Sequence, residues 1–354
     1  MDPVDPSTEL EKIDRNIVEL VNQRAVEVAK AASIRPASDS GSADSAYDPA
    51  GEAIVLDRIA RANRGPVPNG ELVSIYREIL SATRSVNRPI RVGYLGPPAT
   101  FSYQAALQHF GHGATLVPCR TIGDVFLETQ RLIVDYGVVP VENSTEGAVT
   151  HAIDRFLDTD LLVSAEIGLR VSHYLMSNGS LDQIKRVYSH PQGFAQCRRW
   201  LSQHLPNVTE IETASTAAAA QHAREPDAAA IAPEAASEIY NLPIIVPRIE
   251  DVATNITRFL VIGQHMGGRT GHDRTAIVFA VEDRAGALVT ALNCFAAHDI
   301  SLSRIESRPS RRRPWEYVFF VDLTGHPEDD VVQLALAELR ANCEFVRILG
   351  TWSI

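Results

Sequence analysis

Short polar runs directly follow apolar stretches in the middle of the chain. Thr100 and Ser102 come after residues 90–95, and Thr100 is placed to cap the helix that follows. Residues 142–147 follow the apolar residues 136–141 in the same way. Open α/β sheets bind ligands beyond their strand ends, where helix N termini offer free N–H groups and partial positive charge. These turns are therefore suited to hold a carboxylate.

Two further polar segments have the same character. Residues 189–192 open another helix, and residues 255–259 stand where the last strand of this region begins. Each segment taken alone is better explained as a simple helix cap. Four such segments on one sheet predict an anion-binding α/β domain, and composition alone does not narrow the prediction further.

A sheet must position these segments, and strands and helices do alternate from residue 90 to about residue 263. Such alternation is typical of a mostly parallel sheet covered by helices on both faces. The predicted strands are residues 90–95, 136–141, 161–172, 186–189, 228–231 and 256–262. Residues 263–271 are rich in glycine and are predicted to form a linker.

The residues before this region show helical periodicity only. Apolar residues recur at intervals of three and four, beginning with Leu10 and Ile13. The tract 36–46 is predicted to be a loop, followed by an N-cap and a first-turn proline at residues 48–49. A third helix is predicted after residues 68–70. Three helices bury little core by themselves, so this domain is expected to dimerise.

Several polar residues lie among these helices at spacings that bring them together. Arg24 and Arg35 follow the apolar face of the first helix, eleven residues apart. Two arginines that extend along an amphipathic helix would explain this pattern, but further polar pairs in the same bundle favour a site. The other polar pairs, each spaced by about one helical turn, are Asp48 with Glu52 and Thr83 with Asn87.

After residue 274 the pattern changes to strand, helix, strand, strand, helix, strand. The predicted elements are residues 275–281, 286–297, 300–307, 317–323, 329–341 and 343–350. This order is that of a ferredoxin-like βαββαβ unit. Asp283 is predicted to cap the first helix, and Gly286 leaves backbone N–H groups free for an amino-acid carboxylate. Residues 303–309 are predicted to form an edge strand that ends in proline.

The composition excludes several classes of partner. A net charge of −11 disfavours nucleic acid, which requires clustered cations, and the one tight basic run, residues 311–313, is predicted to be a hairpin tip. No apolar run approaches the roughly 20 residues that cross a membrane, and the acidic N terminus is unlike a signal peptide. The cysteines and histidines lack metal-ligand spacing. We therefore expect a cytoplasmic protein without a metal or another cofactor.

Residues 94–102, 137–144 and 257–259 resemble, in this order, the signature segments of the prephenate dehydratase family. The resemblance implies a domain over residues 89–265 with two α/β lobes, like a periplasmic binding protein, and with the substrate between the lobes. The two implied lobes are residues 90–168 with 248–265, and residues 169–247.

The implied reaction removes CO2 and water from prephenate and leaves phenylpyruvate. Aromatisation drives it, so the protein has mainly to orient the dianion and to assist the departure of hydroxide. By resemblance, Thr257 donates a hydrogen bond to the leaving hydroxyl, Arg258 holds a carboxylate in a bidentate manner, and Phe259 forms a wall of the cleft. Adjacent strand residues point to opposite faces, so Thr257 and Arg258 reach one ligand only at a strand end or a bulge. The other residues predicted to line the site are Thr100, Ser102, Asn143, Ser144 and Thr145.

Residues 1–88 resemble the all-helical chorismate mutase that is often fused ahead of prephenate dehydratase. That enzyme is an intertwined dimer whose cations bind the two carboxylates and the ether oxygen of chorismate. The rearrangement to prephenate is pericyclic, so it requires electrostatic preorganisation and no nucleophile or base. Arg24, Asp48 and Glu52 match the family's chorismate-binding pattern, and the other residues predicted to bind chorismate are Arg35, Thr83 and Asn87.

The sequence departs from both families at several positions. In the dehydratase segments, Pro98 replaces a charged residue and Ala99 replaces a glycine, so this turn is expected to be reshaped. In the helical domain, Ser7 and Gly51 stand where the family usually has arginines. The loss of two cations leaves a second interpretation open, in which this domain serves dimerisation only. The smaller departures are Arg35 for lysine and Asn87 for glutamine.

Residues 274–354 resemble the ACT domain of prephenate dehydratases, which pairs across a twofold axis and binds phenylalanine. The implied phenylalanine-binding residues are Gly286, Ala287, Leu288, Glu306, Ser307, Arg308 and Pro309. Feedback inhibition by L-phenylalanine follows if the protein has two conformations that differ in the substrate cleft and the effector has a different affinity for each. A homodimer or homotetramer is then expected.

The expected fold is thus a multidomain chain. It combines an all-α chorismate-mutase-like bundle, a two-lobed α/β domain like a periplasmic binding protein, and an α+β ferredoxin-like ACT domain. A non-catalytic amino-acid sensor with the same folds is the alternative, because fold alone does not fix function. The segment Thr257-Arg258-Phe259 favours an enzyme, since a sensor has no need of a hydrogen-bond donor beside an anion clamp.

Overall fold

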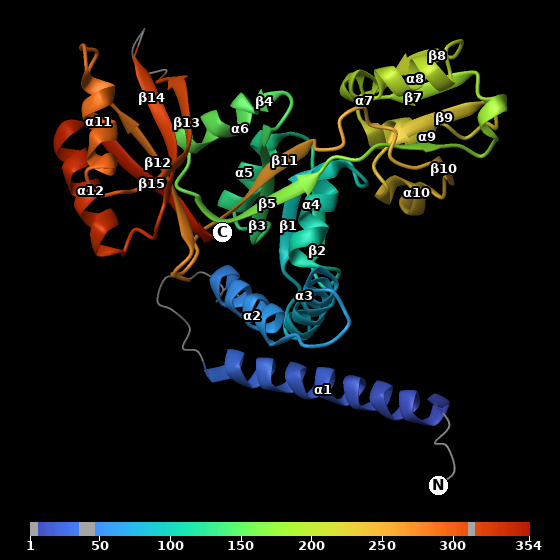
Figure 1. The fold of residues 1–354 in the computed structure, drawn as a ribbon, viewed down its shortest axis with the longest axis horizontal. Helices are drawn as coiled ribbons and strands as arrows, with labels where there is room; N and C mark the ends of the chain where they lie inside the picture. Colours follow the sequence, from blue (N-terminus) through green and yellow to red (C-terminus); the bar gives the residue numbers. More distant parts are fainter. Residues whose placement is uncertain (1–5, 35–46, 311–315) are drawn as a thin grey trace.

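The structure is a computed structural model that describes residues 6–34, 47–310 and 316–354. Arg35, the predicted loop at 36–46 and the basic run at 311–313 lie outside these residues. Figure 1 shows a helical part in blue, a central sheet, a second lobe at the right and a C-terminal part at the left. No helix within the described ranges is long and apolar enough to span a membrane.

The N-terminal part consists of three helices, as predicted. They are α1 (Pro6–Ile34), α2 (Pro49–Ala62) and α3 (Asn69–Ser85). The Asp48 carboxylate accepts a hydrogen bond of 3.0 Å from the Gly51 N–H, which confirms the predicted cap of α2. The apolar stripe of α1 is left in solvent, since Leu10, Ile17 and Leu20 are 60%, 52% and 63% exposed. The contacts within one chain therefore do not bury this stripe.

The central sheet has the strand order β13-β14-β12-β15-β5-β11-β3-β1-β2, with β4 paired to β3. Its strands in this part of the chain are β1 (Arg91–Leu95), β2 (Thr115–Cys119), β3 (Tyr136–Asn143), β4 (Gly147–Ala148), β5 (Leu162–Arg170) and β11 (Ile256–Gly263). The helices are α4 (Phe101–Phe110), α5 (Ile122–Gln130) and α6 (Thr150–Arg155), and a 3₁₀ turn (Phe156–Asp158) follows α6.

The expectation of a mostly parallel sheet is wrong. β1 runs parallel to β2 and β3, but β11 runs antiparallel to both β3 and β5. The physical reason lies in the path of the chain, which leaves for the second lobe along β5 and returns from it along β11. Two neighbouring strands that carry the chain out and back must be antiparallel, so the sheet is mixed.

The second lobe is built on a separate sheet with the order β10-β6-β9-β7-β8. Its strands are β6 (Tyr174–Met176), β7 (Arg186–Ser189), β8 (Thr209–Glu212), β9 (Ala228–Ala232) and β10 (Ile244–Val246). Its helices are α7 (Pro191–Gln196), α8 (Arg198–His204), α9 (Thr216–His222) and α10 (Ala235–Tyr240), with a 3₁₀ turn at Leu181–Gln183. β5 and β11 connect this lobe to the central sheet.

The C-terminal part has the predicted βαββαβ order. Its elements are β12 (Asp273–Ala280), α11 (Ala287–Ala296), β13 (Leu302–Pro309), β14 (Tyr317–Thr324), α12 (Asp330–Asn342) and β15 (Phe345–Ser353). β15 joins the central sheet where Gly350 lies beside Val163 of β5. A Cβ at Gly350 would lie 2.1 Å from the Val163 carbonyl oxygen, and φ there is +149°, so only glycine permits this close approach.

Two predicted turns differ from the structure. Residues 142–147 do not lead from a strand into a helix, because β3 turns back into β4 and α6 begins only at Thr150. Asp283 does not cap α11, because Gly286 occupies the N-cap position with φ of +81° and no side chain bonds to the free N–H groups. In both places the glycine that follows the polar residues determines the turn.

Candidate active site

Three neighbouring strands bring polar residues to one edge of the central sheet. β1 and β3 are parallel, so their C-terminal ends share an edge, and the N-terminal end of the antiparallel β11 lies at the same edge. Thr257 of β11 is paired directly with Asn143 of β3. The polar segments after β3 and at the start of β11 therefore meet, and the turn after β1 follows a strand that ends at the same edge of the sheet.

The side chain of Asn143 has only one possible orientation. Its Oδ1 accepts hydrogen bonds from the Thr145 N–H at 3.0 Å, the Glu146 N–H at 3.2 Å and the Thr145 hydroxyl at 2.6 Å. Backbone N–H groups are donors only, so this atom must be the oxygen, and the NH2 group faces the other way. That NH2 group donates to Thr257 Oγ1 at 2.8 Å. The Thr257 oxygen thus accepts from Asn143, and its own proton remains available for another acceptor.

Ser144 and Asn255 complete this arrangement. Ser144 Oγ accepts from the Ile256 N–H at 3.0 Å, and the Ser144 N–H donates to the Ile256 carbonyl at 2.9 Å. Asn255 Oδ1 accepts the second hydrogen of the Asn143 NH2 group at 2.9 Å. Asn255 belongs to the polar segment at residues 255–259, where no role was predicted for it from sequence. Its position directly before a strand, two residues from Thr257, was the available signal.

The turn after β1 leads into the N terminus of α4. Thr100 caps this helix as predicted, because its Oγ1 accepts from the Tyr103 N–H at 3.3 Å and donates to the Leu95 carbonyl at 3.0 Å. Ser102 is buried in the first turn. Ala99, which stands where the family usually has glycine, has φ of +67° and is fully buried. The backbone there adopts the conformation that glycine favours even though the residue is alanine.

Arg258 faces away from Thr257. Its Nη2 lies 2.8 Å from Glu166 Oε2 and 2.7 Å from Asp322 Oδ2 of β14, and its guanidinium lies 5.7 Å from the centre of the Trp352 ring. Burial opposes the charge of Arg258, but Asp322 and Glu166 outweigh burial and raise the pKa of the guanidinium. In this arrangement Arg258 is therefore occupied by carboxylates of its own chain.

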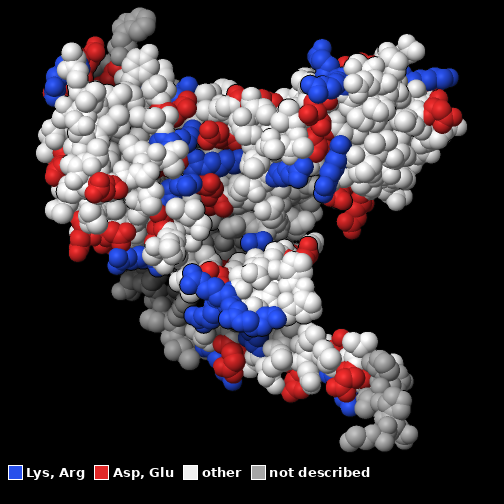
Figure 2. Space-filling view, in the orientation of Figure 1, with Lys and Arg blue, Asp and Glu red and all other residues white. Residues whose placement is uncertain are grey.

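Arg258 belongs to a wider group of charges between the central sheet and the C-terminal part. Arg274 Nη1 lies 3.3 Å from Glu166 Oε2, and Arg304 Nε lies 3.3 Å from Glu142 Oε2. Figure 2 shows basic and acidic side chains interspersed at this junction. The direction of Arg258 follows from strand alternation, since Thr257 and Phe259 share the other face. Phe259 is 1% exposed and lies in the core beside α4, so the structure does not place it as a wall of an open site.

The two lobes are bridged next to the Asn143 turn. Glu146 accepts hydrogen bonds from the side chains of Gln192 and Gln196 on α7, the latter at 2.9 Å. Since the Gln196 NH2 group is committed to Glu146, its oxygen accepts from His173 Nε2, at 2.8 Å. Burial lowers the pKa of His173, although Gln196 and Glu250 oppose the shift. Burial therefore disfavours the charged form of His173 at the crossing between the lobes.

The helical part brings only some of its predicted residues together. The Arg24 guanidinium donates to the Thr83 hydroxyl. Glu52 pairs with Arg84, which sequence analysis did not select, and Arg84 also donates to the Phe110 carbonyl at 3.0 Å. Burial lowers the pKa of Arg24, helped by Arg84 and opposed by Glu52. Burial also raises the pKa of Glu52, although Arg84 and Arg24 oppose that shift.

The other predicted residues of this part lie elsewhere. Asp48 caps α2, and Asn87 is exposed beyond the end of α3. Arg35 lies outside the described residues. A Cβ at Gly51 would lie 2.5 Å from Asp48 Oδ2, so an arginine at this position would displace the capping carboxylate. The cation that the family usually has here is thus incompatible with the cap as it stands.

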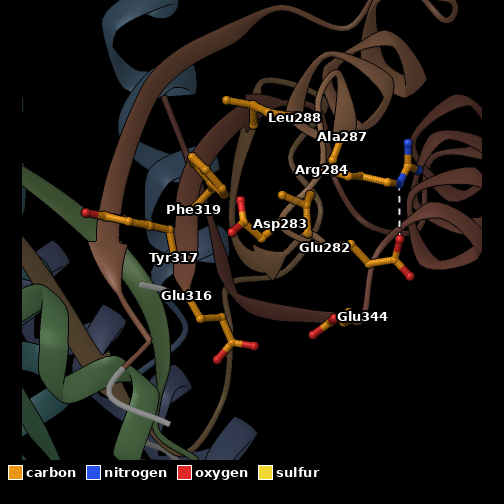
Figure 3. Close-up of a pocket in the computed structure, with 10 residues that line it drawn as sticks. Glu282, Asp283, Arg284, Ala287, Leu288, Glu316, Tyr317, Phe319 and Glu344 are labelled. Carbon is orange, nitrogen blue, oxygen red and sulfur yellow. Dashed lines mark hydrogen bonds and ion pairs between the residues drawn. The ribbon is translucent and has the colours of Figure 1, made fainter. Parts of the chain in front are cut away.

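A pocket opens in the C-terminal part at the turn between β12 and α11 (Figure 3). It is lined by Val281, Glu282, Asp283, Arg284, Ala287, Leu288, Glu316, Tyr317, Phe319 and Glu344. Ala287 and Leu288 are the predicted phenylalanine-binding residues among them, and Gly286 precedes these two. The predicted residues Glu306, Ser307 and Pro309 lie on β13, outside this lining. Arg308 of β13 instead binds the buried Asp154 of α6 through two hydrogen bonds of 2.8 and 3.0 Å.

No group of three or more His, Cys, Asp or Glu residues suited to a metal ion occurs in the part of the chain that the structure describes. The free thiols of Cys119 and Cys197 are buried, and burial raises the pKa of both. The chemistry available at the strand edge is therefore that of hydroxyl and amide donors, helix N–H groups and one bridging carboxylate.

Three family models match the chain in sequence order. Residues 7–88 match chorismate mutase type II, residues 92–267 match prephenate dehydratase, and residues 275–341 match the ACT domain. Together they span the helical part, the two lobes and the C-terminal part in turn.

Relatives match over nearly the whole chain. A bifunctional chorismate mutase/prephenate dehydratase of Aquifex aeolicus is 43% identical, covering 97% of this chain and 96% of the relative. One from Stutzerimonas stutzeri is 40% identical, covering 97% and 95%. A prephenate dehydratase of Arthrobacter aurescens, solved in complex with L-Phe, is similar in structure, with a TM-score of 0.70, 33% identity, and coverage of 75% of this chain and 90% of that one. The chain belongs to the family of bifunctional chorismate mutase/prephenate dehydratases.

Proposed function

We propose that this chain rearranges chorismate to prephenate in residues 1–88 and converts prephenate to phenylpyruvate in residues 89–265. We also propose that L-phenylalanine regulates it through residues 274–354. The order of the three family models and the identity to bifunctional relatives over the full length support this assignment. The observation that carries the dehydratase assignment is the directed hydrogen bond from Asn143 to Thr257.

The dehydratase step needs one well-placed donor. As the carboxylate on the ring leaves as CO2, its bonding electrons enter the ring and the C–O bond to the ring hydroxyl breaks. The departing hydroxide must be stabilised and becomes water on taking up a proton. Thr257 is too weak an acid to give up its proton freely, so it acts as a positioned donor to the leaving oxygen. Asn143 donates to the Thr257 oxygen, so the Thr257 proton is directed to an acceptor other than Asn143.

The substrate carboxylates require positive groups on the same side as Thr257. Thr257, Phe259 and Val261 share one face of β11, and Phe259 and Val261 pack with Ala105 and Phe110 of α4. We therefore assign one carboxylate to the N-terminal N–H groups of α4, with Thr100 and Ser102 beside it. Arg258 is assigned to the junction with the ACT domain, because Glu166 and Asp322 already pair with it.

The mutase step is assigned to a dimer of the helical domain. The exposed apolar stripe of α1 supports this, because a second copy of the domain would remove the stripe from water. Arg24 and Thr83 would form part of the site in each copy, with Glu52 held by Arg84. The missing cations at Ser7 and Gly51 favour the alternative of a domain that serves dimerisation only. A mutase assay decides between the two.

The regulatory assignment rests on the pocket at α11. Its apolar side chains, Leu288, Phe319 and Tyr317, suit an aromatic effector, and the uncapped N terminus of α11 suits a carboxylate. The other predicted residues lie on β13, an edge strand of the sheet. Pairing of two ACT domains along β13 would bring the β13 residues of one copy to the other, which supports a homodimer or a homotetramer.

The test follows phenylpyruvate formation by the full chain from prephenate and, separately, from chorismate. The proposal predicts turnover of both substrates and loss of the chorismate route alone in an Arg24→Ala variant. Turnover of prephenate only would assign residues 1–88 to dimerisation. Turnover of neither would refute the proposal and leave a binding protein. L-phenylalanine added to the prephenate reaction is expected to slow it.

A further inference from the structure

Asn255 is fixed from several sides at the start of β11. It is 3% exposed, and its backbone carbonyl accepts a hydrogen bond of 2.9 Å from the Val171 N–H just beyond β5. Its Oδ1 accepts from Asn143 Nδ2 at 2.9 Å, and the Ser144 hydroxyl lies 3.4 Å from the same oxygen. The side-chain oxygen therefore points at Asn143 and cannot turn away without loss of both contacts.

The hydrogens of Asn143 connect Asn255 to Thr257. The Asn143 NH2 group has two hydrogens, of which one goes to Asn255 Oδ1 and the other to Thr257 Oγ1. If the Asn255 oxygen is removed, one of these hydrogens loses its acceptor. The Asn143 amide can then rotate toward water, and the hydrogen bond that orients Thr257 is no longer fixed.

We propose that Asn255 is a positioning residue of the dehydratase reaction. It fixes Asn143, and through Asn143 it fixes the direction in which the Thr257 hydroxyl donates to the leaving oxygen. This inference rests on the proposed function of Thr257 as that donor. Asn255 acts through its side-chain oxygen and does not need to touch the substrate.

A purely structural role for Asn255 predicts a different pattern. A structural residue would lower the stability of the protein and slow the reaction whether or not Thr257 is present. A positioning residue that works through Thr257 has nothing to position once the Thr257 hydroxyl is gone. The decisive measurement is therefore the effect of Asn255 in the presence and absence of that hydroxyl.

The experiment compares Asn255→Ala, Thr257→Val and the double variant in the full chain, with prephenate as substrate. Asn255→Ala is expected to lower kcat about 10- to 100-fold, as misorientation of a reacting group does, and to leave KM within about twofold. In the Thr257→Val background the same change is expected to leave the residual rate unaltered. Asn255→Asp keeps the acceptor oxygen, so its kcat should stay within about threefold of the wild type, while its added charge raises KM for the dianion.

A matched control removes comparable hydrogen bonds from the other lobe. The Ser177 hydroxyl is 1% exposed, donates to the Ala228 carbonyl at 2.7 Å and accepts from the Gly179 N–H at 3.0 Å. Ser177→Ala is expected to lower the melting temperature without lowering kcat. The circular dichroism spectrum and the melting temperature of each variant report whether the chain is folded.

Two results would overturn the inference. One is an Asn255→Ala variant with the kcat of the wild type, and the other is an equal loss with and without the Thr257 hydroxyl. If Asn255→Ala does not fold, Asn255→Asp decides, because a large loss of kcat with the acceptor oxygen retained contradicts the proposed role. A wild-type chain that makes no phenylpyruvate would instead refute the proposed function itself.

Discussion

Replacement of Arg258 by glutamine is expected to destabilise the protein far more than it weakens binding of prephenate. Arg258 lies between Glu166 and Asp322, at 2.8 and 2.7 Å, and faces away from Thr257. Glutamine would remove the charge and leave two carboxylates of like charge at the junction with the ACT domain. The substrate side of β11 would keep Thr257 and its hydrogen bond to Asn143.

The size of the effect follows from burial. Removal of one partner from a buried ion pair costs about 3–5 kcal/mol, because it leaves a buried charge uncompensated. The side chains of Arg258, Glu166 and Asp322 are 14%, 23% and 7% exposed, so some of this cost is relieved by solvent. We expect a loss of about 2–3 kcal/mol, and domains of this size lose roughly 2–4 °C of melting temperature for each kcal/mol. The predicted drop is therefore roughly 4–12 °C.

Differential scanning calorimetry and prephenate kinetics test this together. The double variant Arg258→Gln with Asp322→Asn should be more stable than Arg258→Gln alone, because the second change removes an unpaired carboxylate. KM for prephenate should stay within about threefold of the wild type, since no substrate contact is lost in this arrangement. An unchanged melting temperature with a KM raised tenfold or more would refute the reasoning. It would assign Arg258 to a substrate carboxylate, as the sequence led us to expect.

Three further predictions concern other parts of the fold. Burial, together with nearby arginines, lowers the pKa of His109 from 6.5 to about 3, so the unfolded chain binds a proton there that the folded chain does not. The free energy of unfolding should therefore fall by about 1.4 kcal/mol for each pH unit from pH 6.5 down towards 3. Denaturant titrations at a series of pH values should show this loss in the wild type, and His109→Gln should lack it. Gly350→Ala should destabilise the protein by several kcal/mol, about as much as severe overpacking does. Gly70 has open space around its Cβ position, so Gly70→Ala should leave the melting temperature unchanged. Ile17→Glu with Leu20→Glu should abolish the rearrangement of chorismate while prephenate turnover persists, whether or not pairing of the ACT domains keeps the chain dimeric; a mutase rate equal to that of the wild type would contradict the proposed helical dimer.

Local features of the fold were predictable from sequence because they depend on neighbours in the chain. The cap at Asp48 and the cap at Thr100 are set within one helical turn, and both were predicted. β7 was predicted with its observed bounds, Arg186–Ser189, because its apolar residues stand between clear turn signals. β8 was missed because Thr209–Glu212 contains a single apolar residue, and only its pairing with β7 makes it a strand.

Features that depend on distant parts of the chain were not predictable from local pattern. The antiparallel position of β11 results from the path of the chain through the second lobe. The Asp322 partner of Arg258 comes from another domain, so the sequence around Arg258 gave no sign of it. Likewise, Arg84 looked like an ordinary last-turn residue of α3, and only the fold brings Glu52 and Phe110 to it.

The candidate site lies between these two cases. The strand-end rule and the family resemblance together brought Thr257, Asn143, Ser144 and Thr145 to one edge, where the structure has them. The direction of the Asn143–Thr257 hydrogen bond was beyond the sequence, because it follows from the N–H groups of the turn that fix the Asn143 oxygen.

The most direct measurement is the rate of phenylpyruvate formation from prephenate by wild type and by Thr257→Val. Valine has nearly the shape of threonine but lacks the hydroxyl, so the variant removes the donor and little else. Loss of one preorganised donor lowers kcat by about 10²- to 10³-fold, and that loss is predicted, with the rate of chorismate rearrangement unchanged. A Thr257→Val variant that keeps more than a third of the wild-type kcat would contradict the account.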